Sequence, residues 1–289
     1  MNTNGNAYTV IYSTIIVVFV AAILAFTAMS LKPRKDANVK AETIRQMLMA
    51  AQFQTGELGN DAILAEYSKN IEKAFIINSE GDSIKSLNTN SGNIELADDL
   101  KLRNKMINNK DQSLELPVYV FKKDGKKVTV IPCYGAGLWG PVWGYIAFDE
   151  DLKTILGAYF DHESETPGLG AKIKDDPSFR SGLIGKNADF SSERIFEIIK
   201  GGVPEGRTNA IDAITGATMT TKGLDEAINT WLAAYKPYME KNSKKEYCCY
   251  EEMESCDCIT EAADSVKCPV EPCAEDISKE KASEEAETK

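Results

Sequence analysis

The segment Asp212–Thr218 combines residue types and a position that could bind a phosphate group. Its sequence is Asp-Ala-Ile-Thr-Gly-Ala-Thr, and it leads directly into residues 219–238, where apolar side chains recur at helical spacing. Thr218 is therefore expected at the start of a helix, where backbone N–H groups without partners and the positive end of the helix dipole favour an anion. A threonine that only caps the helix is the alternative interpretation.

Two glycine-containing segments could form a surface for a bulky planar ligand. Residues 135–140, Gly-Ala-Gly-Leu-Trp-Gly, follow a predicted strand, and glycines let the backbone approach a ring that the Leu138 or Trp139 side chain covers. Residues 162–170, His-Glu-Ser-Glu-Thr-Pro-Gly-Leu-Gly, end another predicted strand and carry two glycines that allow a close wrap around a ligand. A glycine-rich corner with a core tryptophan, and a plain turn, are the respective alternatives.

Composition excludes several classes of function. The chain has 289 residues and a formal net charge of −11, but residues 32–240 carry 26 basic and 30 acidic side chains, a balance that gives no general attraction for nucleic acid. His162 is the only histidine, which excludes HExxH zinc sites and makes any Ser-His-Asp triad depend on this one residue. We expect no catalytic residue and no metal site, and we interpret His162 as a hydrogen-bonding residue.

An apolar segment near the start of the chain predicts a membrane anchor. Residues 9–31 are 23 uncharged residues, and a helix of that length rises about 34 Å, enough to cross the hydrocarbon core of a bilayer. A cleaved signal peptide is the alternative, but it would have a basic leading region and a shorter apolar core. Lys32, Arg34 and Lys35 follow the span, and by the positive-inside rule they would leave the rest of the chain in the cytoplasm.

The rest of the chain is expected to fold as α+β, with a twisted antiparallel sheet packed by helices. Apolar, β-branched runs on both sides of Asp124-Gly125 predict a hairpin, because this dipeptide tolerates the backbone of a tight turn. Helical spacing over residues 41–53 predicts a stalk, and residues 62–76 have weak helical character. Further strands are expected at 143–148, 155–161 and 194–200, and the helix over 219–238 should pack on the sheet.

Residues 241–289 differ in composition from the rest of the chain. They hold 14 acidic residues against 7 lysines, few large apolar residues, and six of the seven cysteines. We expect an acidic, flexible extension with partly oxidised thiols. Disulfides or an ordered metal site are the alternatives, although no CxxC pair with regular zinc spacing is present.

The motifs together carry a resemblance to a known family. Asp-x-x-[Ser/Thr]-Gly-Ala-Thr is similar to the flavinylation motif of FMN-binding domains, whose last threonine carries FMN in a phosphoester bond made from FAD by a Mg²⁺-dependent flavin transferase. The apolar span, Gly137-Leu138-Trp139, residues 165–170 and this motif follow one another as in the C subunits of Na⁺-translocating NADH:quinone oxidoreductases, which the chain resembles over residues 9–238. Thr215 stands where serine is commoner in that family.

The resemblance implies a covalently bound flavin and a function in electron transport. FMN would be attached to Thr218, making the chain a phosphoprotein, and the flavin ring would lie near Leu138, Trp139 and the turn 166–170. The protein would relay electrons within a sodium-transporting translocase that oxidises NADH and reduces ubiquinone, and would not be a complete enzyme alone. The implied cofactor-binding residues are Thr218, Thr215, Gly216, Ala217, Asp212, Leu138, Trp139, Glu165, Thr166, Pro167, Gly168, Leu169 and Gly170.

The resemblance also implies an organisation and a location. In the family this domain lies outside the cytoplasm, so despite the flanking charges we expect one pass through a bacterial inner membrane and a periplasmic domain. The related G subunit of the Rnf complex and a flavin-free, membrane-anchored binding module are the alternatives. The expected parts are an N-terminal end (1–8), the membrane span (9–31), a helical stalk and accessory region (32–110), the FMN-binding domain (111–240) and the acidic tail (241–289).

Overall fold

The computed structural model describes residues 5–97 and 99–255. The chain divides into two units, residues 1–249 and 250–289. The first unit contains the fold, and the described part of the second is the end of one helix, up to Ser255. Of the acidic extension predicted for residues 241–289, residues 256–289 therefore lie outside the described residues.

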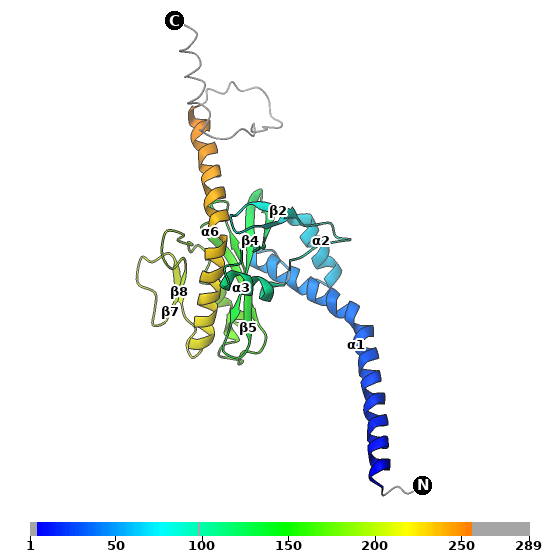
Figure 1. Cartoon of the computed structure of the whole chain (residues 1–289). Coiled ribbons are helices and arrows are strands. Elements are labelled where there is room, and N and C mark those ends of the chain that lie inside the picture. Colours follow the sequence, from blue (N-terminus) through cyan, green and yellow to red (C-terminus); the bar gives the residue numbers. More distant parts are fainter. Residues whose placement is uncertain (1–4, 98, 256–289) are drawn as a thin grey trace. The chain divides into compact units, whose positions relative to one another are not determined.

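A six-stranded antiparallel sheet forms the centre of the first unit (Figure 1). Its strand order is β2-β1-β3-β4-β5-β6, so the strands from β3 to β6 lie side by side in chain order. This confirms the predicted α+β fold with an antiparallel sheet. The strands are β1 (Ile71–Ile77), β2 (Ser83–Ser86), β3 (Leu116–Lys123), β4 (Lys126–Ala136), β5 (Pro141–Phe148) and β6 (Ile155–His162).

The hairpin of β3 and β4 forms where the sequence predicts it. Lys123 pairs with Lys126 across the turn, and the two turn residues Asp124 and Gly125 have φ angles of 50° and 87°. Two successive positive φ angles define a turn whose twist matches that of paired strands, and aspartate followed by glycine adopts them at low cost. The local sequence therefore determines this part of the sheet.

The helix expected from the weak helical pattern over residues 62–76 is confirmed for residues 62–70 and wrong for residues 71–76, which form a strand. α2 (Asn60–Asn70) ends where β1 begins, and β1 pairs with both β2 and β3. Phe75 and Ile77 are buried on one side of the sheet and Ala74 on the other. Burial on both faces makes the end of β1 a continuous apolar run, which cannot be distinguished from a helix by spacing alone. Two strands of the sheet thus come from the region expected to be a stalk and accessory segment.

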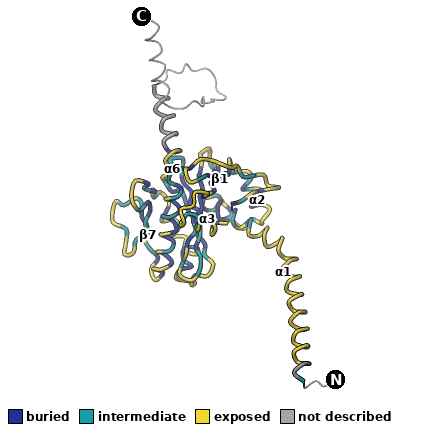
Figure 2. Tube along the Cα trace, viewed as in Figure 1, coloured by how far each residue is buried: buried dark blue, intermediate teal, exposed yellow. Residues whose placement is uncertain are grey.

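Helices cover both faces of the sheet. In β3, Val118 and Val120 contact the core beneath α6 (Thr218–Ser255), whereas Tyr119 and Phe121 contact the core beneath the end of α1 (Asn6–Ala50) and α2. This alternation is the two-residue period of a strand. Figure 2 shows buried residues concentrated where the sheet lies, and exposed residues along the first part of α1 and in the outer loops.

α1 is a single helix that contains the predicted membrane span and continues into the sheet domain. Its residues 8–50 are long and apolar enough to cross a membrane, with a mean hydropathy of 2.6 in the most apolar window. The side chains of this window are exposed, whereas Ile44, Met47 and Leu48 near the helix end are fully buried against the sheet. The helix therefore connects an apolar exposed segment to the protein core.

α6 is longer than the sequence predicts. It begins at Thr218 and runs to Ser255, and Pro237 lies inside it rather than at its end. Proline removes one backbone hydrogen bond, but its fixed φ is itself helical. The remaining elements are α3 (Leu100–Asn108), α4 (Lys172–Asp175), α5 (Pro177–Ser181), and the parallel pair β7 (Glu197–Ile199) and β8 (Ala210–Asp212), of which β7 lies within the strand predicted at 194–200.

Candidate functional site

Thr218 is the first residue of α6, and its side chain is exposed. The first intrahelical hydrogen bond of α6 runs from the Thr221 N–H to the Ala217 carbonyl, at 2.9 Å. The carbonyl that accepts this first bond belongs to the capping residue of a helix, so Ala217, and not Thr218, occupies the capping position. Among the described residues the Thr218 hydroxyl has no hydrogen-bond partner, which leaves it free for another role.

A tight turn presents Thr218. The Ala217 N–H donates to the Ile214 carbonyl at 3.2 Å, and Gly216, the third residue of this turn, has a φ of 82°. Glycine is the residue that adopts this backbone without strain. A Cβ atom at Gly216 would lie 3.0 Å from a methyl carbon of Leu169, so the turn lies directly against the segment 166–170.

The segment 166–170 is itself a proline-glycine turn. The Leu169 N–H donates to the Thr166 carbonyl at 3.1 Å, Pro167 is the second residue, and Gly168 has a φ of 76°. This is the arrangement of a type II turn, in which proline fixes one corner and glycine supplies the positive φ at the next. The turn leaves Leu169 exposed, whereas Gly170 is buried.

Glu165 connects this turn to the other two predicted motifs. Its side chain is buried, and its two carboxylate oxygens accept hydrogen bonds from the Trp139 N–H at 3.0 Å and from the Thr220 hydroxyl at 2.6 Å. The Glu165 N–H donates to Nδ1 of His162 at 3.2 Å. His162 therefore accepts at Nδ1 and has the hydrogen-bonding role that its isolation in the sequence indicates. Glu165 thus joins the two glycine-containing segments to the first turn of α6, which directly follows the motif 212–218.

Four large apolar side chains on these segments are exposed beside the polar ones. We call Leu138, Trp139, Leu169 and Met219 the apolar surface, and their exposed fractions are 51%, 66%, 44% and 58%. Large apolar side chains gathered at an exposed point commonly mark a binding site. Together with the free hydroxyl of Thr218, the apolar surface could hold a planar group attached to, or bound beside, the start of α6.

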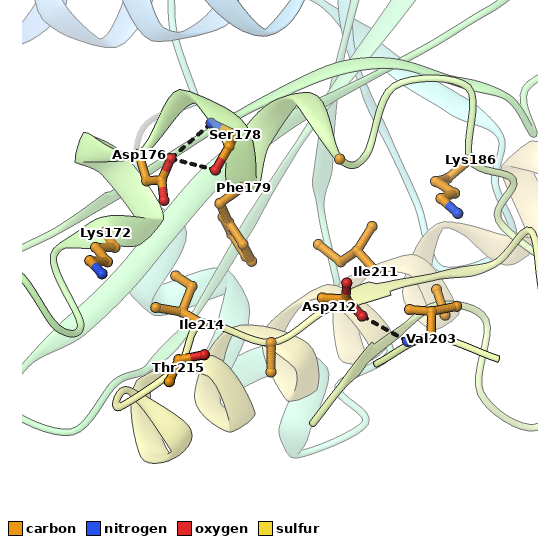
Figure 3. Close-up of a pocket in the computed structure, with 13 residues that line it drawn as sticks. Lys172, Asp176, Ser178, Phe179, Lys186, Val203, Ile211, Asp212, Ile214 and Thr215 are labelled. Carbon is orange, nitrogen blue, oxygen red and sulfur yellow. Dashed lines mark hydrogen bonds between the residues drawn. The ribbon is translucent and has the colours of Figure 1, made fainter. Parts of the chain in front are cut away.

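Asp212 is exposed, as Thr215 and Thr218 are, but its carboxylate is hydrogen-bonded within the fold. It is the last residue of β8, and its Oδ1 accepts a hydrogen bond from the Val203 N–H at 2.7 Å (Figure 3). This bond ties the strand end to the loop before it, so the structure gives Asp212 a loop-holding contact of the kind expected for an aspartate beside a turn.

A cavity of about 510 Å³ lies behind the same motif. Asp212 and Thr215 line it together with the apolar side chains of Phe179, Ile211 and Ile214 (Figure 3). Its volume is in the range of small-molecule sites. Lys172 and Lys186 also line it. Sequence reasoning missed these two lysines and Phe179, because no local pattern places them beside a motif more than 20 residues further along the chain.

A second polar network joins the end of α1 to the strand that precedes Glu165. Gln46 donates to Asp161 at 3.0 Å and accepts from the Trp143 indole N–H at 3.2 Å, and Lys174 donates to the same carboxylate at 2.9 Å. Burial lowers the pKa of Lys174, but its hydrogen bond to Asp161 and the charge of that carboxylate outweigh this effect, so the pKa is raised overall. Lys174 is therefore a fixed cation that neutralises the buried Asp161.

The part of the chain that holds these segments matches a known protein family. Residues 137–233 match the FMN-binding domain family, a range that contains every predicted site residue. The C subunit of the Na(+)-translocating NADH-quinone reductase of Yersinia pestis is 36% identical over 130 residues, which are 43% of this chain and 48% of that protein. The match thus spans about half the length of that relative. The corresponding protein of Pseudomonas aeruginosa is 27% identical over 247 residues, 80% of this chain and 93% of that protein.

Two solved structures resemble the chain. A crystal structure of the C subunit of the Na(+)-translocating NADH-quinone reductase from Parabacteroides distasonis has a TM-score of 0.61 and 30% sequence identity, and the match covers 72% of this chain and 96% of that one. NqrC from Shewanella oneidensis has a TM-score of 0.55 and 28% identity, with coverage of 71% and 97%.

Proposed function

The chain belongs to the family formed by the C subunits of the Na(+)-translocating NADH-quinone reductases, and on this premise we propose that it is a membrane-anchored flavoprotein that relays electrons through FMN held at Thr218. The observation that carries the proposal is the convergence of three distant segments around one free hydroxyl. Thr218, the turn 166–170 and the loop with Trp139 are joined through Glu165 and surround an exposed apolar surface.

The residues present fit the parts of FMN. The phosphate suits the first turn of α6, where backbone N–H groups lack intrahelical partners and the helix dipole is positive. The isoalloxazine ring is flat and largely apolar, and Leu138, Trp139, Leu169 and Met219 offer it exposed apolar side chains. The positive φ of Gly216 brings the backbone of the anchor segment against Leu169, so anchor and ring surface adjoin.

We propose a covalent phosphoester bond between FMN and the Thr218 Oγ. A Mg²⁺-dependent flavin transferase, with FAD as donor, would form the Oγ–P bond while the P–O bond to the AMP part breaks. The hydroxyl proton is released and AMP leaves. The exposure of Thr218 and its freedom from the capping role support this step, since an acceptor hydroxyl must be accessible to a second protein and not engaged in the fold.

When bound, FMN supplies the redox chemistry, because the flavin takes up and releases electrons. The chain's own residues bind and orient it: Thr218 prevents its loss, and the apolar surface excludes water from one side of the ring. The sequence contains no nicotinamide-binding fingerprint, so oxidation of NADH, reduction of quinone and movement of Na⁺ would depend on partner subunits. In this proposal the chain has no catalytic side chain and acts as one relay within a larger oxidoreductase.

We further propose that α1 crosses a bacterial inner membrane once and that the domain lies on the periplasmic side. The length and hydropathy of α1 support the span. Lys32, Arg34 and Lys35 follow the span and argue for the opposite orientation, but a large domain can be exported regardless of a few flanking charges. Reaction of a cysteine placed at an exposed domain residue with a membrane-impermeant thiol reagent in intact cells tests the side directly.

Mass analysis of the purified protein tests the flavin. The full chain is produced with a flavin transferase, denatured and digested, and the peptide that contains Thr218 is weighed. We expect an increment of FMN minus water and yellow fluorescence that survives denaturation. Thr218→Ala should lose both, whereas the matched control Thr208→Ala, an exposed threonine in a neighbouring loop, should keep them. An unmodified peptide despite an active transferase would instead support the flavin-free binding module.

The Rnf G subunit is the nearer alternative, because it shares the flavinylated motif. The family to which the chain belongs favours the NADH-quinone reductase. Co-purification of the tagged chain from its own membranes separates the two, since the retained subunits would differ between the complexes.

A further inference from the structure

A buried carboxylate stands at the centre of the site without a cationic partner among the described residues. Glu165 is 4% exposed, and its oxygens accept from one backbone N–H, of Trp139, and one hydroxyl, of Thr220. Burying a carboxylate costs free energy unless its oxygens are hydrogen-bonded. Both oxygens are engaged within the protein, so neither is directed to an exposed ligand.

The surroundings of Glu165 leave space for its carboxylate only because two neighbours are glycine. A Cβ atom at Gly137 would collide with Oε1 of Glu165, and a Cβ atom at Gly170 would collide with Oε2 and lie 2.6 Å from the Thr220 Oγ1. The carboxylate is thus enclosed between the loop of Trp139 and the turn 166–170. Its position is determined by backbone on both sides.

Glu165 holds together three segments that are distant in the sequence. Trp139 lies 26 residues before it and Thr220 lies 55 residues after it. A parallel contact supports the first link, because the Ser164 hydroxyl donates to the Trp139 carbonyl at 2.7 Å. The segment of Trp139 carries two of the four residues of the apolar surface, and α6 begins with Thr218, two residues before Thr220. The relative position of anchor and ring surface therefore depends on Glu165.

We propose that Glu165 is a positioning residue, which sets the distance between the FMN anchor at Thr218 and the loop of Leu138 and Trp139 without touching the flavin. This inference rests on the proposed function, and it differs from the expectation that Glu165 binds the cofactor. Its consequence is that the site is preorganised before FMN arrives, because the carboxylate and its two donors need no ligand.

The Glu165→Gln variant distinguishes a positioning role of Glu165 from a role of its negative charge. In Glu165→Gln the amide oxygen can accept from the Trp139 N–H, and the NH₂ group can donate to the Thr220 hydroxyl, which is also an acceptor. Both links are then kept while the charge is removed. Glu165→Ala removes both links and the charge. A positioning role predicts that glutamine rescues the site, whereas a direct electrostatic effect on the flavin predicts that glutamine and alanine behave alike.

Hydrogen exchange of the unloaded protein tests the positioning directly. The full chain is purified in detergent from cells without the transferase, and exchange is followed for peptides covering residues 137–140 and 218–222. Glu165→Ala should speed exchange of the Trp139 amide by about tenfold or more, the factor that corresponds to about 1.4 kcal/mol for a lost hydrogen bond to a charged acceptor. Glu165→Gln should stay near the wild type, as should the control Glu163→Ala, which removes an exposed carboxylate two residues away.

Visible circular dichroism of the loaded protein tests the effect on the flavin. Where mass analysis finds FMN on Thr218, Glu165→Ala should change the flavin band and Glu165→Gln should restore it. Equal exchange in Glu165→Ala and the wild type, or equal changes in the alanine and glutamine variants, would refute the positioning role. A wild type without covalent flavin would refute the proposed function, whereas the exchange experiment would still give its own answer.

A second pair of variants covers the case in which Glu165→Ala does not fold. Thr220→Val removes one of the two links at nearly constant volume, and Thr220→Ser keeps the hydroxyl. Faster exchange in Thr220→Val over residues 162–170 with recovery in Thr220→Ser supports the positioning role, and indistinguishable exchange in the two variants overturns it.

Discussion

Gly223→Ala is a sharp test of how α6 is fixed on the sheet. Alanine in place of glycine inside a helix ordinarily stabilises it by about 1 kcal/mol. In this structure, however, a Cβ atom at Gly223 would collide with the carbonyl oxygen of Ala136 and lie 3.4 Å from the Cα of Gly137. These are backbone atoms, so no side chain can rotate away, and α6 must move from β4 instead.

The expected outcome is a net loss of stability. Overpacking in a close contact costs about 1–3 kcal/mol, and against backbone we expect the upper part of that range, so about 1–2 kcal/mol remains after the gain in helix propensity. For a domain of this size that lowers Tm by roughly 2–8 °C. Thermal unfolding of the full chain in detergent, followed by circular dichroism at 222 nm, measures this shift.

The matched control is Ala233→Gly, at an exposed position of the same helix. Helix propensity alone predicts opposite signs for the two substitutions, whereas the structure predicts that both destabilise. A Tm of Gly223→Ala above that of the wild type would falsify the close approach of α6 to the end of β4.

Three further expectations concern buried and charged groups. Trp231→Phe removes the indole N–H that donates to the Tyr134 carbonyl at 2.9 Å and to Oδ1 of Asn104 at 3.0 Å, and it should cost about 2 kcal/mol in chemical denaturation, because two partly buried acceptors lose their donor. Burial raises the pKa of the Cys133 thiol to about 12, so peptide mapping at pH 8 should find it unlabelled by maleimide in the native protein and labelled after denaturation. Hydrogen bonds from Ser191 and its neighbour hold the pKa of Asp189 at about 2. The stability that this aspartate adds relative to Asp189→Asn should be present above pH 4 and vanish as the pH falls through about 2, and equal pH profiles of the two proteins would refute it.

Local chemistry explains which parts of the fold the sequence predicts. The hairpin at Asp124-Gly125 and the turn at Pro167-Gly168 depend on φ angles that only a few residue types adopt easily, so their position can be inferred from neighbours in the chain. The start of α6 at Thr218 follows from the change to helical spacing after Gly216.

Other parts depend on contacts between distant residues. The end of the segment 62–76 is a strand because β3 pairs with it, and that partner lies some 40 residues further along the chain. The end of α6 was predicted from Pro237, which the helix accommodates. At the site, the sequence marks Glu165 as part of a motif, but its two partners, Trp139 and Thr220, become apparent only when the chain is folded. Residue types indicate the chemistry, and the fold decides which of them face a ligand and which hold the others in place.

Because α1 is one continuous helix, it limits how far the domain can move from the proposed membrane span. No loop separates its exposed apolar part from Ile44, Met47 and Leu48, which are buried against the sheet. From residue 31 to residue 44 a helix rises about 20 Å along its axis. Pro33 lies within this stretch, where proline removes a backbone hydrogen bond and permits a bend, so a short helix that can bend, and not a flexible loop, would join the domain to the proposed span. The electron donor and the electron acceptor would then have to approach the flavin at a distance from the membrane that this helix limits. The distances of the donor and the acceptor from the membrane would be matched to the length of this helix. One added or deleted helical turn would displace the flavin by about 5 Å along the helix axis.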